Sequence, residues 1–140
     1  MKKKLFCLLV ALMTLAGFLP GALPNTSPPS ALAATPPSVF TQNPGNVAAT
    51  SATLNGVVDS LGTAVSVNVS FQWGLSSGNY TSETPPLSLS TVGAFSANLT
   101  ALIPGASYYF RAKAVGDGTS YGVEMSFITQ DDLFAVLERM

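Results

Sequence analysis

Residues 102–115 are Leu102-Ile103-Pro104-Gly105-Ala106-Ser107-Tyr108-Tyr109-Phe110-Arg111-Ala112-Lys113-Ala114-Val115, and this stretch decides the fold. Pro104 and Gly105 favour a turn. The alternation that follows predicts a half-buried antiparallel strand, with Tyr108, Phe110, Ala112 and Ala114 facing inward and Tyr109, Arg111 and Lys113 outward. The spacing also predicts a tyrosine corner, in which a Tyr hydroxyl hydrogen-bonds to backbone a few residues upstream. The corner residues would be Leu102, Pro104, Gly105 and Tyr108.

Further alternating stretches, separated by turn residues, predict more strands. The expected strands are residues 38–41, 52–59, 65–73, 80–83, 95–100 and 121–128. In the clearest one, the side chains that share a face are Val65, Val67, Val69, Phe71 and Trp73. Asn43-Pro44-Gly45 is expected to end the first strand, and the last is expected to turn Tyr121, Val123, Met125 and Phe127 inward. Short strands with no helical period predict an all-β sandwich of about seven antiparallel strands.

Three stretches carry a resemblance to a known family. They are Leu102-x-Pro104-Gly105-x-x-Tyr108, then Ser70-Phe71-Gln72-Trp73-Gly74 with a turn to Tyr80, and Gly118 to Gly122 leading to Met125-Ser126-Phe127. They resemble the fibronectin type III family over roughly residues 36–129, the length of one such module. The resemblance implies an immunoglobulin-like sandwich. One departure is that the family often has a Trp on its second strand, where this sequence offers Leu54.

The amino terminus has the features of a secretory leader. Three lysines, residues 2–4, precede an apolar run from Leu5 to Leu19, which Pro20-Gly21 ends. That run is shorter than the roughly 20 residues of a membrane span. Ala31-Leu32-Ala33 is a small-x-small cleavage pattern. We therefore expect a signal peptide at residues 1–33, a linker at 34–37 and the domain at 38–129. Residues 130–140 are expected to form a short tail or the start of a missing domain. The alternative for the leader is that it is not cleaved and serves as a membrane anchor.

Charge and cysteine content restrict the partners. Without the leader, three basic residues face seven acids, a net charge of −4 with no basic cluster. This argues against nucleic acid and against an anionic membrane as partners. The one cysteine, Cys7, lies in the leader, so no disulfide is expected. We expect a secreted or cell-surface monomer with no membrane contact after cleavage.

No catalytic arrangement is found in the sequence. The chain has no His, which excludes Ser-His-Asp triads and histidine metal sites. Asp59, Glu83, Asp117 and Glu124 fall on different loops or edges, so each is expected to be a solvated surface acid rather than half of a glycosidase pair. The oxygen content of its loop leaves a weak calcium site at Asp117 as an alternative, but one carboxylate rarely suffices to hold the ion. We expect no enzyme activity, no metal and no cofactor.

A binding role is what remains. Tyr80, Tyr109 and Tyr121 are the candidate binding residues, because outward aromatic rings on a sandwich can form a platform. The first interpretation is an exported, non-catalytic module that binds protein or polysaccharide at the cell surface or acts as a spacer. The alternatives are a truncated accessory module of a larger secreted polysaccharide-degrading enzyme and a carbohydrate-binding domain. Residues 131–140 are expected to begin a helix, with Asp131 as its cap.

Overall fold

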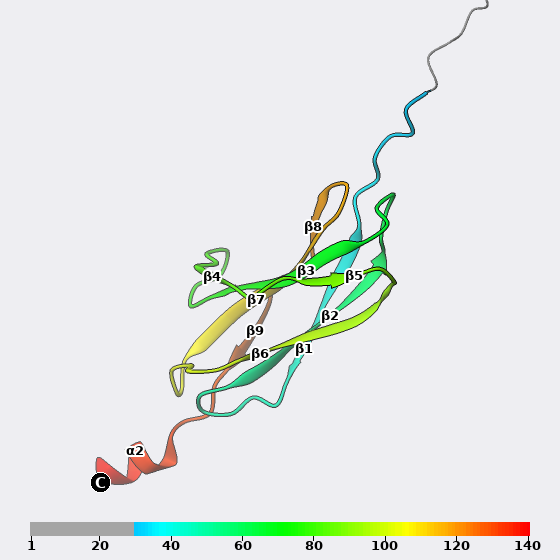
Figure 1. The fold of residues 1–140 in the computed structure, drawn as a ribbon. Coiled ribbons are helices and arrows are strands. Elements are labelled where there is room, and N and C mark those ends of the chain that lie inside the picture. The colour runs from blue at the N-terminus through cyan, green and yellow to red at the C-terminus, as the bar shows by residue number, and fades with distance from the viewer. Residues whose placement is uncertain (1–29) are drawn as a thin grey trace, which may run out of the picture. The chain divides into compact units, whose positions relative to one another are not determined.

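Two antiparallel sheets make up the fold in the computed structural model, which describes residues 30–140 (Figure 1). The small sheet has the order β1-β2-β6, with β1 (Ser38–Gly45), β2 (Ala52–Ser60) and β6 (Gly93–Leu99). The large sheet has the order β4-β3-β7-β8, with β4 (Ser82–Glu83), β3 (Val67–Gly74), β7 (Ser107–Val115) and β8 (Thr119–Tyr121). In addition, β5 (Leu87–Leu89) pairs with β3, and β9 (Met125–Ile128) pairs with β7. A short helix, α2 (Leu133–Glu138), follows the strands.

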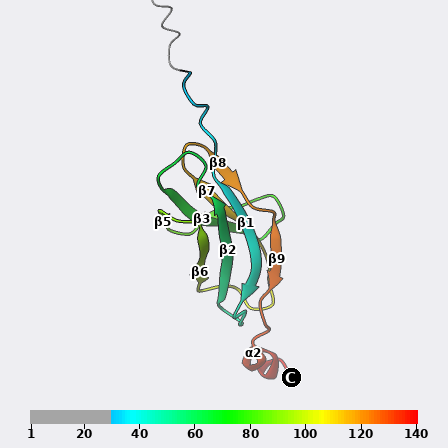
Figure 2. The same cartoon turned by 90° about the vertical axis from the view of Figure 1, so that its right-hand side faces the viewer.

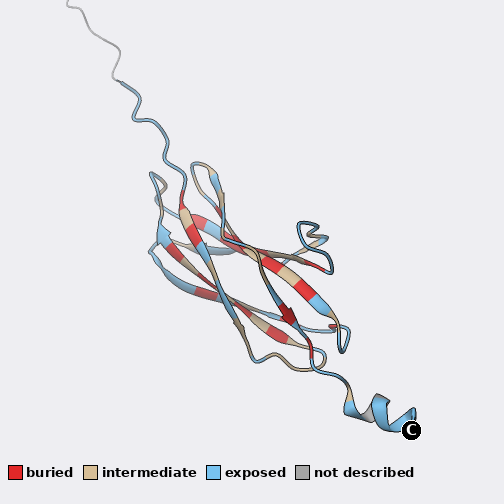
Figure 3. Cartoon of the chain, turned by 180° about the vertical axis from the view of Figure 1, so that it is seen from behind, coloured by how far each residue is buried: buried red, intermediate tan, exposed pale blue. Residues whose placement is uncertain are grey.

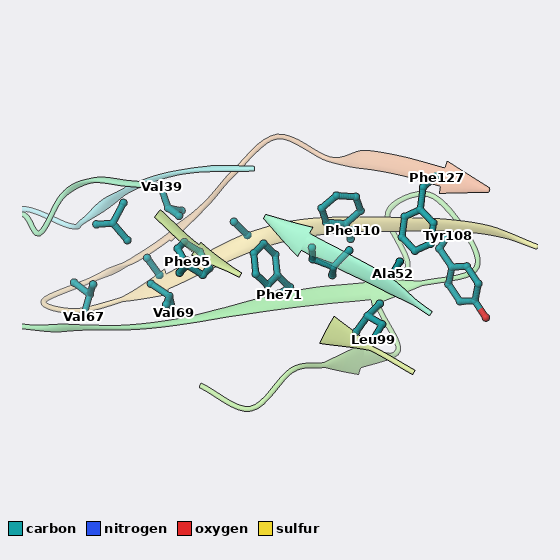
Figure 4. Close-up of a cluster of buried hydrophobic side chains, with 14 of the residues drawn as sticks. Val39, Ala52, Val67, Val69, Phe71, Phe95, Leu99, Tyr108, Phe110 and Phe127 are labelled. Carbon is teal, nitrogen blue, oxygen red and sulfur yellow. The ribbon is translucent and has the colours of Figure 1, made fainter. Parts of the chain in front are cut away.

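The core lies between the two sheets, and buried residues alternate with more exposed ones along β2 and β7 (Figure 3). Phe71 on β3 stacks on Phe95 of β6, with 4.9 Å between ring centroids, and meets Phe110 of β7 edge-on at 6.3 Å. The ring of Tyr108 stacks on Phe127 at 5.5 Å (Figure 4). The other buried apolar side chains are Val39, Ala52, Leu54, Val58, Val67, Val69, Leu99, Leu102, Ala112 and Ala114. The contact between Phe71 and Phe95 thus joins the two sheets.

The all-β sandwich predicted from the sequence is confirmed. The inward and outward faces of β7 are as expected: Tyr108, Phe110, Ala112 and Ala114 are buried. The expected strands at 52–59 and 95–100 correspond to β2 and β6. Each of the pairs β4 with β5 and β8 with β9 lies along one side of a single long strand, so nine segments build a sandwich of about seven strands.

Two strand ends differ from the prediction. The first strand does not stop before Asn43-Pro44-Gly45, because β1 continues to Gly45 through a register shift between Gln42 and Gly45. β1 is an edge strand, and a proline is tolerated at a bulge on an edge. The third strand begins at Val67 rather than Val65, which is 90% exposed. The prediction from alternation therefore included two residues, Val65 and Ser66, that lie outside the strand.

The last predicted strand is broken in two. Tyr121 ends β8, residues 122–124 lie in neither strand, and Met125–Ile128 form β9; Tyr121 and Val123 are exposed rather than buried. At the break, Ala112 on β7 donates its N–H to Thr41 Oγ1 at 2.9 Å, while its carbonyl accepts from Gly122 N at 2.9 Å. The Thr41 side chain, from β1 of the small sheet, thus accepts the hydrogen bond that a backbone carbonyl of a continuous strand would otherwise accept.

The turn before β7 is held by a tyrosine hydroxyl and a threonine. Ile103 N donates to Tyr108 Oη at 2.9 Å, which is the hydrogen bond a tyrosine corner makes. The buried Thr129 hydroxyl accepts from Ala106 N at 2.9 Å and donates to Ile103 O at 2.6 Å. Gly105 has φ +65°, a value that glycine adopts without strain. These contacts fix the direction in which β7 starts.

We predict that Tyr108→Phe lowers the free energy of unfolding by about 1–2 kcal/mol, because Ile103 N–H loses its acceptor. Urea denaturation measures this change. Tyr109→Phe, on the opposite face of β7, is the matched control. An unchanged midpoint for Tyr108→Phe would remove the structural role assigned to this hydroxyl.

The segment Ala33–Met140 forms one compact unit with both sheets and the core, so it can be tested by itself. The signal peptide predicted at 1–33 lies outside the described residues except for residues 30–33, which are exposed coil. In the part of the chain described, no helix is long and apolar enough to cross a membrane.

Candidate functional site

The outer face of the large sheet carries an ordered layer of polar and aromatic side chains. Antiparallel pairing of β3 with β7 sets Gln72 opposite Arg111, and pairing of β8 with β7 sets Tyr121 opposite Lys113. Residues directly opposite one another project on the same side of a sheet. We refer to this surface as the tyrosine–arginine face and define it by Gln72, Tyr80, Glu83, Arg111, Lys113, Tyr121 and Glu124.

Arg111 is at the centre of this face. Its guanidinium carbon lies 4.5 Å from the ring centroid of Tyr80 and 3.9 Å from that of Tyr121. Its Nε and Nη2 both donate to Gln72 Oε1, at 3.1 and 2.9 Å. A cation over an aromatic ring gains about 0.5–1 kcal/mol at an exposed site. The guanidinium is therefore fixed by two rings and by a neutral amide oxygen.

Glu124, between β8 and β9, holds the loop that follows β3. Its carboxylate accepts hydrogen bonds from Ser77 Oγ at 2.6 Å, from Gly78 N at 2.8 Å and from the Tyr80 hydroxyl. These three hydrogen bonds, that from Ser77 foremost, lower the pKa of Glu124. Partial burial and the Glu124 carboxylate raise the pKa of Tyr80. The loop of residues 75–80, which follows β3, is thus hydrogen-bonded to Glu124 in the segment between β8 and β9.

Glu83 on β4 organises the other end of the face. It forms an ion pair with Lys113 at 3.0 Å and accepts from Ser70 Oγ at 2.7 Å and from Gln72 Nε2 at 3.1 Å. Burial opposes its ionisation, but the hydrogen bonds from Ser70, Gln72 and Lys113 outweigh burial and lower its pKa. Gln72 therefore connects Glu83 to Arg111, and the face forms one continuous network.

The lowered pKa values of these two carboxyls give stability a pH dependence. A carboxyl whose folded pKa lies below its ordinary value of 4.5 adds stability above pH 4.5 and loses it on further acidification. We predict that the free energy of unfolding falls below about pH 4.5 and that Glu124→Gln makes this fall shallower. Urea titrations between pH 3 and 7 test it. The control is Glu138→Gln on α2; equal slopes for both variants would contradict the prediction.

The structure brings two of the three candidate tyrosines together. The guanidinium of Arg111 lies over the rings of both Tyr80 and Tyr121, while Tyr109 lies on the same face of β7, opposite Gly74 and Ser126. Within residues 30–140 no ring contact joins Tyr109 to the other two. Because the Arg111 guanidinium lies over both rings, the site is a tyrosine–arginine cluster rather than an open stacking platform.

Sequence reasoning missed several members of the face. Glu83 and Glu124 were expected to be solvated surface acids; Glu83 is exposed, but both carboxylates also accept at least three hydrogen bonds. The outward position of Arg111 on its strand was the one signal available. Asp117 accepts from Thr63 Oγ1 at 2.5 Å. Among the described residues, no three His, Cys, Asp or Glu side chains gather where they could hold a metal ion.

Comparisons with known proteins place the chain among solved β-sandwiches. No protein-family model matches the sequence, and no curated protein matches it. The chain is similar to the sensor domain of the anti-sigma factor RsgI4 from Pseudobacteroides cellulosolvens: its solution structure aligns with a TM-score of 0.58 at 19% identity over 68% of this chain and 76% of that one. A shorter form of that domain aligns with a TM-score of 0.55 at 19% identity over 70% and 98%.

A fibronectin type III domain of human fibronectin type III domain containing protein 3 aligns with a TM-score of 0.48 at 17% identity, over 70% of this chain and 90% of that one. The alignments with TM-scores above 0.5 show a shared fold. The strand order and the hydrogen bond from Ile103 N to Tyr108 Oη agree with that fold and do not depend on these alignments.

Proposed function

From the premise that this chain has a fibronectin type III-like β-sandwich fold, we propose that it is a non-catalytic module that binds a partner outside the cell through the tyrosine–arginine face. Such a fold hosts many functions, so the proposal rests on the site and not on the fold. The leader expected at residues 1–33 supports export. The absence of histidine from the sequence supports a binding role over a catalytic one.

The observation that carries the proposal is the position of the Arg111 guanidinium over two tyrosine rings. A side chain that is held by two rings and two hydrogen bonds has lost its rotational freedom before any partner arrives. Binding to such a surface avoids about 0.5–1.5 kcal/mol of ordering cost for each long side chain. Arg and Tyr are also enriched among residues that dominate binding energy. The face is thus preorganised for recognition.

The charges on the face indicate the class of partner. Two cations, Arg111 and Lys113, accompany two carboxylates, Glu83 and Glu124, so the face has no net charge. A polyanion would gain little from such a surface. A neutral polysaccharide, or a protein surface of mixed polarity, fits a face without net charge better. We take polysaccharide of the cell wall as the first partner to test.

The experiment is a pull-down of residues 33–140 on insoluble polysaccharides and on a cell-wall fraction. We expect Arg111→Ala and Tyr121→Ala to reduce retention at least about tenfold, which corresponds to about 1.4 kcal/mol of binding free energy. Phe40→Ala is the matched control, because Phe40 is an aromatic residue on β1 of the small sheet and is 52% exposed. Retention that Phe40→Ala lowers as much as Arg111→Ala would contradict the assigned face.

A second candidate is an accessory module of a larger secreted polysaccharide-degrading enzyme. It is favoured by the side chains of Leu133 and Leu137 on α2, which are 73% and 66% exposed and would suit a neighbouring domain. A coding sequence that continues beyond Met140 would favour this candidate, and a stop codon would favour a stand-alone module. The sensor role of that RsgI4 domain belongs to that protein and does not extend to this chain at 19% identity.

A further inference from the structure

Three hydrogen bonds join the loop of residues 75–80 to other parts of the described structure, and all three end on the carboxylate of Glu124. Ser77 Oγ donates to its Oε1, while Gly78 N and the Tyr80 hydroxyl donate to its Oε2. The first five residues of the loop are exposed, so burial contributes little to holding them. The position of the loop therefore depends on this one side chain.

The backbone on both sides of Glu124 is fixed. Glu124 lies in residues 122–124, which connect β8 to β9 (Figure 2). Two residues before it, Gly122 N donates to Ala112 O of β7 at 2.9 Å. Directly after it, Met125 begins β9, which pairs with β7. The carboxylate therefore projects from a segment that is anchored to β7, so a loss of its contacts frees the loop and not Glu124.

The hydrogen bonds from the loop depend on the charge of the carboxylate. Hydrogen bonds to an ionised acceptor are roughly twice as strong as those to a neutral one. Both oxygens of Glu124 already face donors, so a proton on either oxygen must displace a donor or turn it around. The other titratable groups that face Glu124 in the described structure are Tyr80 and Arg111. Both keep their protons in acid, so Glu124 is the member of this cluster that titrates there.

We propose that Glu124 is a positioning residue of the tyrosine–arginine face, and that its protonation releases the loop and with it the Tyr80 ring from Arg111. This inference rests on the proposed function, because the Tyr80 ring is part of the face that binds the partner. Tyr121 lies on β8 and stays in place, so release removes one of the two rings beneath the guanidinium. The hydrogen bonds to Glu124, that from Ser77 foremost, hold its pKa below the ordinary 4.5. The face is therefore complete near neutral pH and opens reversibly in acid.

NMR spectra of residues 33–140, recorded as pH is lowered from 7, test the release without any partner. The Gly78 amide signal reports the hydrogen bond of that amide, and the nuclear Overhauser effect between the Tyr80 ring and the Arg111 side chain reports their contact. Both are expected to be lost as pH falls below about 4.5, while the signals of the buried core stay in place. A contact between Tyr80 and Arg111 that persists after the Glu124 carboxyl signal shows protonation would overturn the proposal.

Glu124→Gln tests the same release at pH 7. Its side chain has an NH2 donor where the carboxylate has an acceptor oxygen, so it resembles the protonated state. The contact between Tyr80 and Arg111 is expected to be reduced in this variant. Asp59→Asn is the matched control and is expected to keep the contact, because Asp59 is an exposed acid on β2 of the small sheet. Equal contacts in the two variants would overturn the proposal.

The pull-down on polysaccharide, repeated over the same pH range, measures the consequence for binding. Retention of the unmodified chain is expected to fall about two- to tenfold in acid, because the partner must then order the Tyr80 side chain. Glu124→Gln is expected to bind that much more weakly at pH 7 and to show a shallower pH profile. Glu83 titrates in both proteins, so the difference between their profiles belongs to Glu124. Parallel profiles would overturn the positioning role. Absence of retention at every pH would instead contradict the proposed function, and the NMR contacts would still decide whether Glu124 holds the loop.

Discussion

A Phe71→Ala variant is expected to lose about 3–5 kcal/mol of the free energy of unfolding, the largest effect of any single substitution considered for this chain. Phe71 is fully buried, and its ring contacts Phe95 in the small sheet and Phe110 in the large one. Removing it leaves a cavity where the two sheets meet. Since a domain of this size has a total stability of about 5–15 kcal/mol, the loss would be a large share of that stability.

Urea denaturation of residues 33–140 measures this loss, and Val65→Ala is the control. Simple alternation would place Val65 on the same face as Phe71, but the structure leaves Val65 exposed ahead of β3. Its truncation should change stability by no more than about 0.5 kcal/mol. A large loss for Val65→Ala, or a small one for Phe71→Ala, would contradict the start of β3 and the location of the core.

A Gly122→Ala variant is expected to be destabilised by about 1–3 kcal/mol through steric overlap. A Cβ at this position would lie 2.3 Å from Thr41 Oγ1 and 2.5 Å from Thr41 N. Either β1 or the break between β8 and β9 must then move. Movement would also weaken the hydrogen bond from Ala112 N to Thr41 Oγ1, which links the two sheets.

Two measurements check the Gly122 prediction. The thermal midpoint reports the loss of stability, and hydrogen exchange of the Ala112 amide reports the loss of its acceptor. Gly45→Ala is the matched control, because a Cβ there would meet only Asn55 Nδ2, at an ordinary 3.5 Å. Exchange of the Ala112 amide that is unchanged in Gly122→Ala would show that Thr41 does not protect it.

The sandwich itself was predictable from local patterns in the sequence. Period-two alternation locates β7, and the spacing from Leu102 to Tyr108 indicates its starting turn. Both signals lie within 14 consecutive residues. The break after Tyr121 was not predictable, because its cause is a hydrogen bond to Thr41, 71 residues earlier in the chain than Ala112. A local sequence pattern contains no information about which distant residue, here Thr41, will lie next to β7.

The same break explains why only part of the candidate site was found. A continuous strand at 121–128 would have buried Tyr121, whereas the separate β8 pairs Tyr121 with Lys113 and turns it outward toward Arg111. Tyr80 reaches Arg111 from a loop whose position depends on Glu124. Arg111 and Glu124 therefore acquire their roles from strand register and loop contacts, which residue types alone do not specify.

The most direct test of the proposed binding face is a titration of isotope-labelled residues 33–140 with soluble fragments of cell-wall polysaccharide, followed by the amide signals in NMR spectra. The account predicts that the signals that shift belong to β3, β7, β8 and the loop of residues 75–80, and that Arg111→Ala abolishes the shifts. Shifts confined to β1, β2 and β6, or shifts that persist unchanged in Arg111→Ala, would contradict it.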